Sequence, residues 1–550
     1  MIDCCRRRLP ALACLAAALL LAATAGAQPV GQVYPAADDF ALAGSAPPLP
    51  ERAAAGVAAI RAEALAAHIR FLASPALAGR GLGSPGLEAA LEYAGAQLAL
   101  AGVQPLPSDA GNAASSYFQT VPLRGFSDFG GTVTIERRDG ELRRSRSFAA
   151  ALDCLLPALP SQTIAAPVVF AGYGIREEKL GYDDYRGLDV RGKAVIILTG
   201  VPPGPQWQEE KVRKRWAGDP ADPSYRAKLD AVRPLGVVAV LAVEGDGWAA
   251  HLAAKDAIVE RFFLPAEQGP AGEEDPPLVP VSAAVSDFLG LSDHTVKGDL
   301  AGVTATIETH GNERRLVSRN AIGWITGSDE TLRGEAVVIG AHVDHLGDTG
   351  GAVHPGADDN ASGSAALLEI MRTFAAGAVR PKRSLVLAFW TGEEEGHLGS
   401  ELYVRHPLWP LAHTTAYLNL DMIGHPWLEK EIRELVTGAK LEGADAFLAA
   451  VKTEDFAEPG VADWSPELAA VLRRAGPGVG LAIHLDRTDG RHGGSDYRGF
   501  ARAHIPFVRF FGNFFPDYHE PGDTANRLDA AQVQRIARFC FATAWLVADR

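Results

Sequence analysis

The sequence predicts an α/β fold with a mixed, largely parallel sheet sandwiched by helices, and a β-rich domain inserted into that fold. From Ala321 onward, apolar strands alternate with helical segments, which is typical of a parallel sheet covered by helices. Between 126 and 312 the pattern changes to short β-type runs separated by loops rich in proline and glycine. At 550 residues the chain is also too long for one ordinary core.

The N-terminus has the features of a secretory signal peptide. Three arginines at 6–8 precede an apolar run at 9–23, and Ala25-Gly26-Ala27 provides an A-x-A cleavage site. The apolar run is shorter than the ~20 residues that span a bilayer. We therefore expect a signal peptide at 1–27 and Sec-type export to the periplasm or the cell exterior. We expect no membrane span in the mature chain.

Composition narrows the class of protein. The chain has 47% hydrophobic and 22% charged residues, as expected of a globular protein rather than a disordered one. Its formal net charge of −15 argues against nucleic acid as a partner. Removal of the signal peptide leaves only Cys154 and Cys540, which allows at most one disulfide bond.

A linker at 28–50 is expected to lead into the N-terminal part of the main domain at 51–125. Apolar residues at helical spacing predict two helices there, near 60–72 and 87–100. The glycine-rich loop 78–86 between them lacks a Lys-Ser/Thr ending and does not follow a strand. We interpret it as a turn without chemistry.

The stretch 126–312 is interpreted as the β-rich insert. Its clearest strand-type runs are 131–136, 166–170, 194–198 and 237–241. Nothing in it assembles a cluster of metal ligands or a nucleophile. Segments 170–174, 182–185 and 190–197 resemble the protease-associated domain, a β-rich insert of several peptidase families. That resemblance implies a lid or spacer, which we favour over a second active site.

The remaining segment, 313–550, is predicted to contain the sheet and the chemistry. Its expected strands are 335–339, 384–390, 416–420 and 506–511, and its expected helices are 363–374 and a closing helix from about Asp529. In open α/β sheets, ligands bind beyond the carboxyl ends of the strands.

Polar residues gather at those strand ends. His342 and Asp344 follow the first strand, three glutamates at 393–395 follow the second, and Asp421 follows the third. An acidic loop at 357–363 starts the intervening helix. Imidazole and carboxylate groups together suit zinc or a similar divalent ion.

Each of these groups has a simpler explanation by itself. Asp358 could cap the following helix, and the three glutamates could be a solvated run of charge. Asp421 could be a turn residue, and His519 an ordinary loop histidine. Their joint position at predicted sheet edges favours a metal site instead. Three carboxylates and two histidines are enough to hold two metal ions if one aspartate bridges them.

The sequence resembles the M28 family of co-catalytic zinc peptidases over about 321–425 and 490–525, and more loosely around Arg80. The resemblance implies the zinc aminopeptidase-like phosphorylase/hydrolase fold and two Zn²⁺ ions, with other divalent metals as alternatives. The ligands that it implies are His342 of His-Val-Asp, Asp358 of Ala-Asp-Asp-Asn as the bridging carboxylate, Glu394 of Gly-Glu-Glu-Glu-Gly, Asp421 of Asn-Leu-Asp-Met and His519 of Tyr-His-Glu-Pro-Gly-Asp-Thr.

The same resemblance gives roles to three further residues. Glu393 matches the general base beside the activated water, Asp344 a carboxylate that fixes a ligand imidazole, and Tyr518 a phenol that stabilises the developing oxyanion. We interpret His345 as a structural or outer-shell histidine, because five ligands already complete the site. His425 has no clustered partner in the sequence and is expected at the surface.

The leading hypothesis is an exported zinc aminopeptidase that hydrolyses N-terminal residues from peptide substrates. The nearest alternative is a metallocarboxypeptidase or dipeptidase on the same fold, which would need a basic pocket; Arg491, Arg498 and Arg509 are candidates for it. A cyclotransferase would resemble a single-zinc site. A non-catalytic binding protein would be expected to have lost ligands or the base, and none is missing here.

Overall fold

The computed structural model describes residues 39–550 with short gaps. The gaps are 106–115, 151, 157–160, 208, 218–224, 246–247, 249–260, 267–275, 293, 350, 378–379 and 492. The predicted signal peptide at 1–27 and residues 28–38 of the predicted linker lie outside the described residues.

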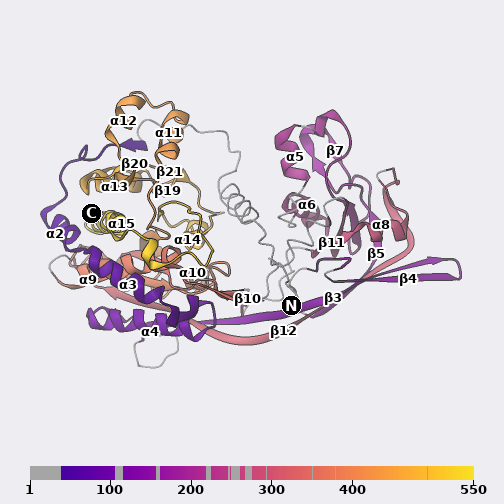
Figure 1. Ribbon diagram of the computed structural model, residues 1–550, viewed down its shortest axis with the longest axis horizontal. Helices are drawn as coiled ribbons and strands as arrows, with labels where there is room; N and C mark the ends of the chain where they lie inside the picture. The colour runs from indigo at the N-terminus through magenta and orange to yellow at the C-terminus, as the bar shows by residue number, and fades with distance from the viewer. Residues whose placement is uncertain are drawn as a thin grey trace, which may run out of the picture. The chain divides into compact units, whose positions relative to one another are not determined.

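The chain divides into two compact units. The first takes the residues up to Val121 together with Val317–Arg550, and the second is Pro122–Leu316. Strands β3 (Phe118–Asp139) and β12 (Gly298–Ile325) contribute residues to both, as can be followed in Figure 1. The second unit therefore begins and ends within a few residues of the insert expected at 126–312. Its assignment to the protease-associated domain stays a prediction.

The first unit is built on a mixed sheet with a parallel centre. In spatial order its strands are β12, β16 (Ser384–Trp390), β13 (Ala336–His342), β17 (Thr414–Leu420), β22 (Phe507–Phe510), β19 (Gly460–Ala462) and β21 (Asp486–Thr488). β16, β13, β17 and β22 run parallel to one another, whereas β12 and β19 join them antiparallel. The predicted mixed, largely parallel sheet is confirmed.

The central strands are apolar along their whole length because helices cover both faces. Every residue of β13 and β16 is buried. On one face, Trp390 of β16 packs with Tyr403 of α10 (Leu398–Arg405) and Phe500 of α14 (Tyr497–Arg502). On the other, α9 (Gly363–Ala375) and α15 (Ala530–Ala548) pack against β13. These two layers are the sandwich that the sequence predicts.

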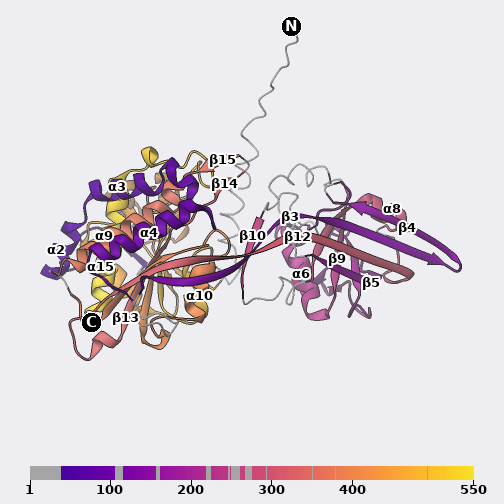
Figure 2. The same cartoon turned by 90° about the horizontal axis from the view of Figure 1, so that it is seen from below.

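The remaining helices of the first unit are α2 (Glu51–Ala59), α3 (Ala62–Leu72), α4 (Pro85–Leu100), α11 (Glu429–Gly438), α12 (Ala444–Ala450) and α13 (Pro466–Gly478). The predicted helices near 60–72 and 87–100 are thus confirmed as α3 and α4. Figure 2 shows α3, α4 and α9 side by side. Helix α2 packs closely on α15. A Cβ atom added to Gly56 of α2 would lie only 2.2 Å from the ring of Phe541 in α15, so this contact leaves no room for a side chain.

The first unit also contains a three-stranded sheet of β1 (Phe40–Ala41), β20 (Ala482–His484) and β18 (Phe456–Ala457), and a hairpin of β14 (Gly347–Thr349) and β15 (Ala352–His354). A short strand, β2 (Gln104–Pro105), pairs with β12. Among the described residues, no helix is both long enough and apolar enough to cross a membrane.

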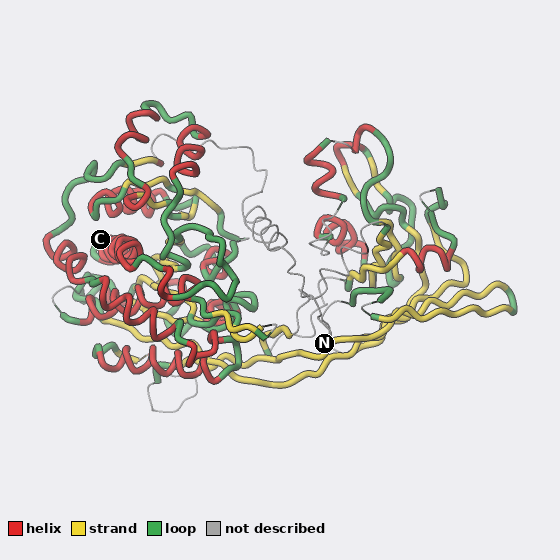
Figure 3. Tube along the Cα trace, in the orientation of Figure 1, coloured by secondary structure: helices red, strands yellow, loops and turns green. Residues whose placement is uncertain are grey.

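The second unit is rich in strands (Figure 3). Its sheet runs β11 (Leu278–Ser282), β9 (Ala239–Glu244), β8 (Ala194–Leu198), β5 (Gln162–Phe170) and β12, and β3 forms a hairpin with β4 (Leu142–Ala149) and pairs with β10 (Arg261–Pro265). The helices are α5 (Glu210–Trp216), α6 (Arg226–Val232) and α8 (Ala283–Leu289). Two apolar clusters cover the opposite faces of this sheet, with Val168 and Ile196 in one and Val169 and Val195 in the other.

Packing between α9 and α15 is expected to contribute strongly to the stability of the first unit. Phe374 of α9 stacks on Phe541 of α15 with ring centroids 4.3 Å apart, and both rings are fully buried. Phe374→Ala is expected to lower the free energy of unfolding by about 3–5 kcal/mol through lost burial and a cavity. The exposed Leu100→Ala should change it by less than about 1 kcal/mol. Chemical denaturation of both variants checks this; equal effects would contradict it.

Candidate metal centre

The candidate site lies beyond the carboxyl ends of three neighbouring parallel strands. β13 ends at His342, β16 ends three residues before Glu393, and β17 is followed directly by Asp421. His342 and Trp390 occupy the same level of the paired strands β13 and β16. The sheet therefore brings side chains that are distant in sequence to one edge.

Two groups of side chains meet at this edge. In the first, His342 Nε2 lies 3.4 Å from Asp359 Oδ1 and 3.3 Å from Asp421 Oδ1. In the second, His519 Nε2 lies 3.1 Å from Asp359 Oδ2 and 3.3 Å from Glu394 Oε2. The structure thus brings together four of the five residues that the sequence singled out as ligands.

The fifth, Asp358, points elsewhere, and its neighbour Asp359 takes the place expected for it. Asp358 Oδ1 accepts a hydrogen bond from the Gly424 amide at 2.7 Å, and its Oδ2 lies 2.7 Å from His425 Nδ1. Adjacent residues of this turn project in different directions, so a shift of one residue changes which carboxylate faces the histidines. His425, expected at the surface, is instead the partner of Asp358 and stacks on Phe515.

The two oxygens of Asp359 face different groups, since Oδ1 lies toward His342 and Oδ2 toward His519. The loop that presents Asp359 is fixed by Asp523, whose carboxylate accepts hydrogen bonds from the amides of Asp358 and Asp359 at 2.9–3.1 Å. Asp359 is therefore the carboxylate that faces both groups of side chains and could bridge ions held by them.

The buried carboxylates of the cluster favour positive charge on the neighbouring histidines. Burial lowers the pKa of His342, but the charges of Glu393 and Asp421 outweigh it, so this pKa lies well above its usual value. In His519, Glu394 and Asp359 outweigh burial in the same way and raise the pKa. Burial raises the pKa of Asp359, yet His345, His342 and His519 bring it well below its usual value. The carboxylates around both histidines therefore favour positive charge at this edge of the sheet.

This donor set fits a divalent metal. Three overlapping groups of histidine and carboxylate side chains among the described residues could hold an ion, and Asp359 belongs to two of them, once with His342 and Asp421 and once with His345 and Glu394. Bonds of ~2.0–2.1 Å in a tetrahedral zinc site place neighbouring ligand atoms about 3.3 Å apart. The nitrogen–oxygen distances of 3.1–3.4 Å within the two groups agree with that spacing.

Comparison with known proteins places this region in a family. Residues 320–544 match the family described as Peptidase family M28. The chain contains a peptidase family M28 domain. The solved aminopeptidase from Aneurinibacillus sp. strain AM-1 has the same fold, with a TM-score of 0.53 at 19% identity over 90% of this chain and 95% of that chain.

Two curated relatives are similar in sequence to parts of this chain. Leupeptin-inactivating enzyme 1 of Streptomyces exfoliatus is 35% identical over 134 residues, which are 24% of this chain and 28% of that protein. The probable glutamate carboxypeptidase VP8 of Zea mays is 28% identical over 511 residues, 84% of this chain and 63% of that protein. The chain therefore matches less than two thirds of the length of each.

Asp344 holds the M28 domain's glutamate loop through its backbone. This fully buried carboxylate accepts hydrogen bonds from the amides of Glu393 at 3.2 Å and Glu394 at 3.4 Å. His342 Nδ1 lies 3.1 Å from the main-chain oxygen of Asp344 and 3.9 Å from its carboxylate. The imidazole is thus oriented by the carbonyl group, whereas the sequence interpretation gave that role to the carboxylate.

Asp421 is held by a pair of polar residues that the sequence interpretation missed. Asn419 Nδ2 donates to Ser495 Oγ at 2.8 Å, and Ser495 Oγ donates to Asp421 Oδ2 at 2.6 Å. The other oxygen of Asp421 is left to face His342. The sequence does contain a signal for Asn419. Side chains alternate between the two faces of a strand, so Asn419 points to the same side of β17 as Asp421 two residues later.

Glu393 and Tyr518 lie close to the cluster. Burial raises the pKa of Glu393 well above its usual value, and Asp421 and Glu394 add to this while His342 opposes it. Glu393 Oε2 lies 4.0 Å from His342 Nε2. Tyr518 stacks on His519 with ring centroids 3.8 Å apart, and burial together with Asp359 and Glu394 raises its pKa. Both groups are therefore protonated more readily than in water.

Arg80 has a structural role that the sequence interpretation also missed. Its guanidinium is fully buried and donates to the main-chain oxygens of Val343 at 2.7 Å, Pro355 at 2.7 Å, Gly356 at 2.8 Å and Leu72. Burial lowers its pKa to about 10, so it stays charged near neutral pH. Arg80 thus ties the loop after β13 to the loop before Asp358. The loop that contains it was interpreted as a turn without chemistry.

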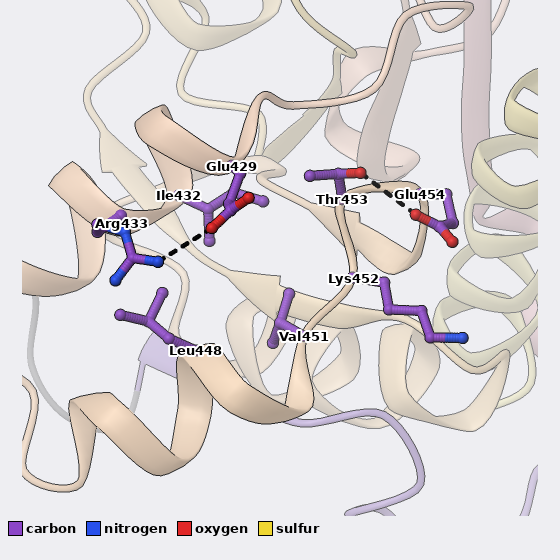
Figure 4. Close-up of a pocket in the computed structure, with 8 residues that line it drawn as sticks. All are labelled: Glu429, Ile432, Arg433, Leu448, Val451, Lys452, Thr453 and Glu454. Carbon is purple, nitrogen blue, oxygen red and sulfur yellow. Dashed lines mark hydrogen bonds and ion pairs between the residues drawn. The ribbon is translucent and has the colours of Figure 1, made fainter.

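A pocket of about 260 Å³ lies apart from these residues. It is lined by residues of α11 and α12 and of the turn that follows them, including the Glu429–Arg433 ion pair in Figure 4. None of the candidate ligands lines it. The chemistry of the M28 domain is therefore assigned to the sheet edge.

Arg80 is expected to be essential for the stability of the M28 domain. Arg80→Met would remove the hydrogen bonds to four main-chain oxygens, among them the buried ones of Val343 and Leu72, and the cation beside several carboxylates, which should cost at least about 3 kcal/mol. Arg80→Lys should recover part of this, because lysine keeps the charge but not the planar fork. Arg70→Met, an exposed arginine of α3, is the control. Calorimetric unfolding of the metal-free chain checks this; an unchanged unfolding temperature in Arg80→Met would contradict it.

Proposed function

We propose that this protein is an exported, zinc-dependent aminopeptidase that removes N-terminal residues from peptides at a two-zinc centre. The observation that carries the proposal is the placement of Asp359, whose two oxygens face two separate groups of ligand side chains. Membership of the M28 family supports a peptidase reaction. Export is supported by the signal-peptide pattern at 1–27.

The proposed ligands follow from the two groups. His342 and Asp421 would hold one ion, Glu394 and His519 would hold the other, and Asp359 would contribute to both. Nitrogen and oxygen donors in this number suit zinc. When bound, the two ions supply Lewis acidity toward the scissile carbonyl group and make a water molecule acidic enough to attack near neutral pH.

Glu393 is proposed as the general base. It accepts a proton from the attacking water and returns it to the nitrogen of the leaving amine, so that its carboxyl group is unchanged after each cycle. Tyr518 is proposed to donate its phenol hydrogen to the developing oxyanion. Asp344 positions both Glu393 and Glu394 through their amides.

The pairing of nearby arginines favours the N-terminus of a peptide over its C-terminus. Two of the three arginines considered for a carboxylate pocket are already paired: Arg498 Nε lies 3.1 Å from Glu401, and Arg509 Nη2 lies 3.0 Å from Asp486. A metallocarboxypeptidase or dipeptidase is the second candidate, because the probable glutamate carboxypeptidase VP8 aligns with 84% of this chain.

Hydrolysis of aminoacyl-anilides by residues 28–550 tests the proposed activity. We expect chromophore release that a chelator abolishes and added Zn²⁺ restores. Glu393→Ala should lower kcat by about 10²–10⁴-fold, because the base is lost, whereas Glu395→Ala should leave kcat within about twofold. Cleavage restricted to dipeptides with a free C-terminus would favour the second candidate. Zinc binding without any hydrolysis would indicate a binding protein.

Zinc content tests which aspartate bridges. Asp359→Asn should lose at least one of two zinc ions per chain, because the amide cannot supply two anionic oxygens to two ions. Asp358→Asn keeps an oxygen for the Gly424 amide and should retain both ions. Metal analysis after dialysis at a fixed free zinc concentration measures this. Loss of zinc from Asp358→Asn with retention in Asp359→Asn would restore the assignment made from the sequence.

A further inference from the structure

His345 makes a close contact with one proposed ligand of the metal centre. It follows Asp344 in the loop after β13 and is almost completely buried. Its Nδ1 lies 2.6 Å from Glu394 Oε1, within hydrogen-bond distance, and 3.7 Å from Asp359 Oδ2. The imidazole therefore sits beside the group formed by Asp359, Glu394 and His519.

The two oxygens of Glu394 have different neighbours. Oε1 is paired with His345, whereas Oε2 lies 3.3 Å from His519 Nε2. A separation of 2.6 Å is much shorter than the ~3.3 Å expected between two ligand atoms of one tetrahedral zinc ion. It is the length of a strong hydrogen bond to a carboxylate. The distances thus indicate a hydrogen-bonded pair rather than two ligands of the same ion.

The surroundings fix the orientation of the His345 ring. A Cβ at Gly356 would lie 2.5 Å from ring atoms of His345, so the ring packs directly on the glycine backbone. The His519 ring lies 5.7 Å away, centroid to centroid, at an interplanar angle of 64°. The His345 amide donates to the Arg80 oxygen at 3.3 Å. The ring therefore has little freedom to turn away from Glu394.

We propose that His345 is the positioning residue for Glu394. Its Nδ1–H donates to Oε1 and directs Oε2 toward the ion that Glu394 shares with His519 and Asp359. This inference rests on the two-zinc centre of the proposed function. A partner of this kind typically changes metal affinity 10–100-fold. The effect should be confined to one of the two ions, because His345 lies outside the group formed by His342, Asp359 and Asp421.

Zinc titration of the full-length chain and its variants tests the inference. Leucine and asparagine have the same shape, and the asparagine amide lies where histidine has Nδ1. His345→Leu should bind one zinc ion with wild-type affinity and the second about 10–100-fold more weakly, while His345→Asn should restore most of the second affinity. His68→Leu, at a histidine that pairs with Tyr93, should leave both ions unchanged. The inference would be overturned if His345→Leu lowered the affinity for both zinc ions equally. It would also be overturned if both variants of His345 lost the same affinity, or if neither lost any.

A measurement on the wild-type chain does not depend on how the variants fold. With ¹¹³Cd in place of zinc and ¹⁵N-labelled histidine, two histidines, His342 and His519, should show cadmium–nitrogen coupling, and His345 should not. Coupling to a third histidine would make His345 a ligand and overturn the inference. Failure of the chain to bind either metal would overturn the metal centre as well. Metal binding without peptide hydrolysis would refute the aminopeptidase proposal alone, and the coupling pattern would still decide the role of His345.

Discussion

The burial of several carboxylates at one edge of a parallel sheet is the constraint on which the rest of the M28 domain depends. The carboxylates are Asp344, Asp359, Glu393, Glu394 and Asp421. Buried carboxylates that lack partners are strongly unfavourable, and each like-charged neighbour adds to the cost. The domain therefore places histidines between them, and protonation of His342 and His519 supplies positive charge until a metal ion does so.

Charged residues that are not proposed ligands hold the main chain of the site. Asp523 accepts the amides of the Asp358–Asp359 turn, and Asp344 accepts those of Glu393 and Glu394. Arg80 donates to carbonyl groups of the loops on either side. Each of these side chains satisfies backbone groups that no secondary structure would pair at this position. The ligand loops are consequently fixed before any ion is bound, which lowers the reorganisation needed for binding and catalysis.

The sequence predicted the strands and their polar ends because continuous apolar runs and the residues that follow them are local features. It assigned the bridging position to Asp358, whereas the structure turns Asp359 toward the histidines, because the direction in which adjacent side chains of an irregular turn project depends on its backbone. Arg80 and Asp523 were missed for a different reason. Their partners are main-chain groups, many of them far away in sequence, and such partners leave no pattern of residue types. The signals available for Arg80 were the loose family resemblance around it and the unusual position of an arginine between two glycines in a largely apolar stretch.

The arginines near the glutamate loop bear on which end of a peptide the proposed enzyme would accept. A C-terminal carboxylate that used Arg498 or Arg509 would have to compete with Glu401 or Asp486, which already pair with them. The carboxylates of the cluster do not decide the question by themselves, because two divalent ions bound there would offset their negative charge. The net charge of −15 acts over a longer range and attracts a positively charged peptide N-terminus toward the protein at low ionic strength.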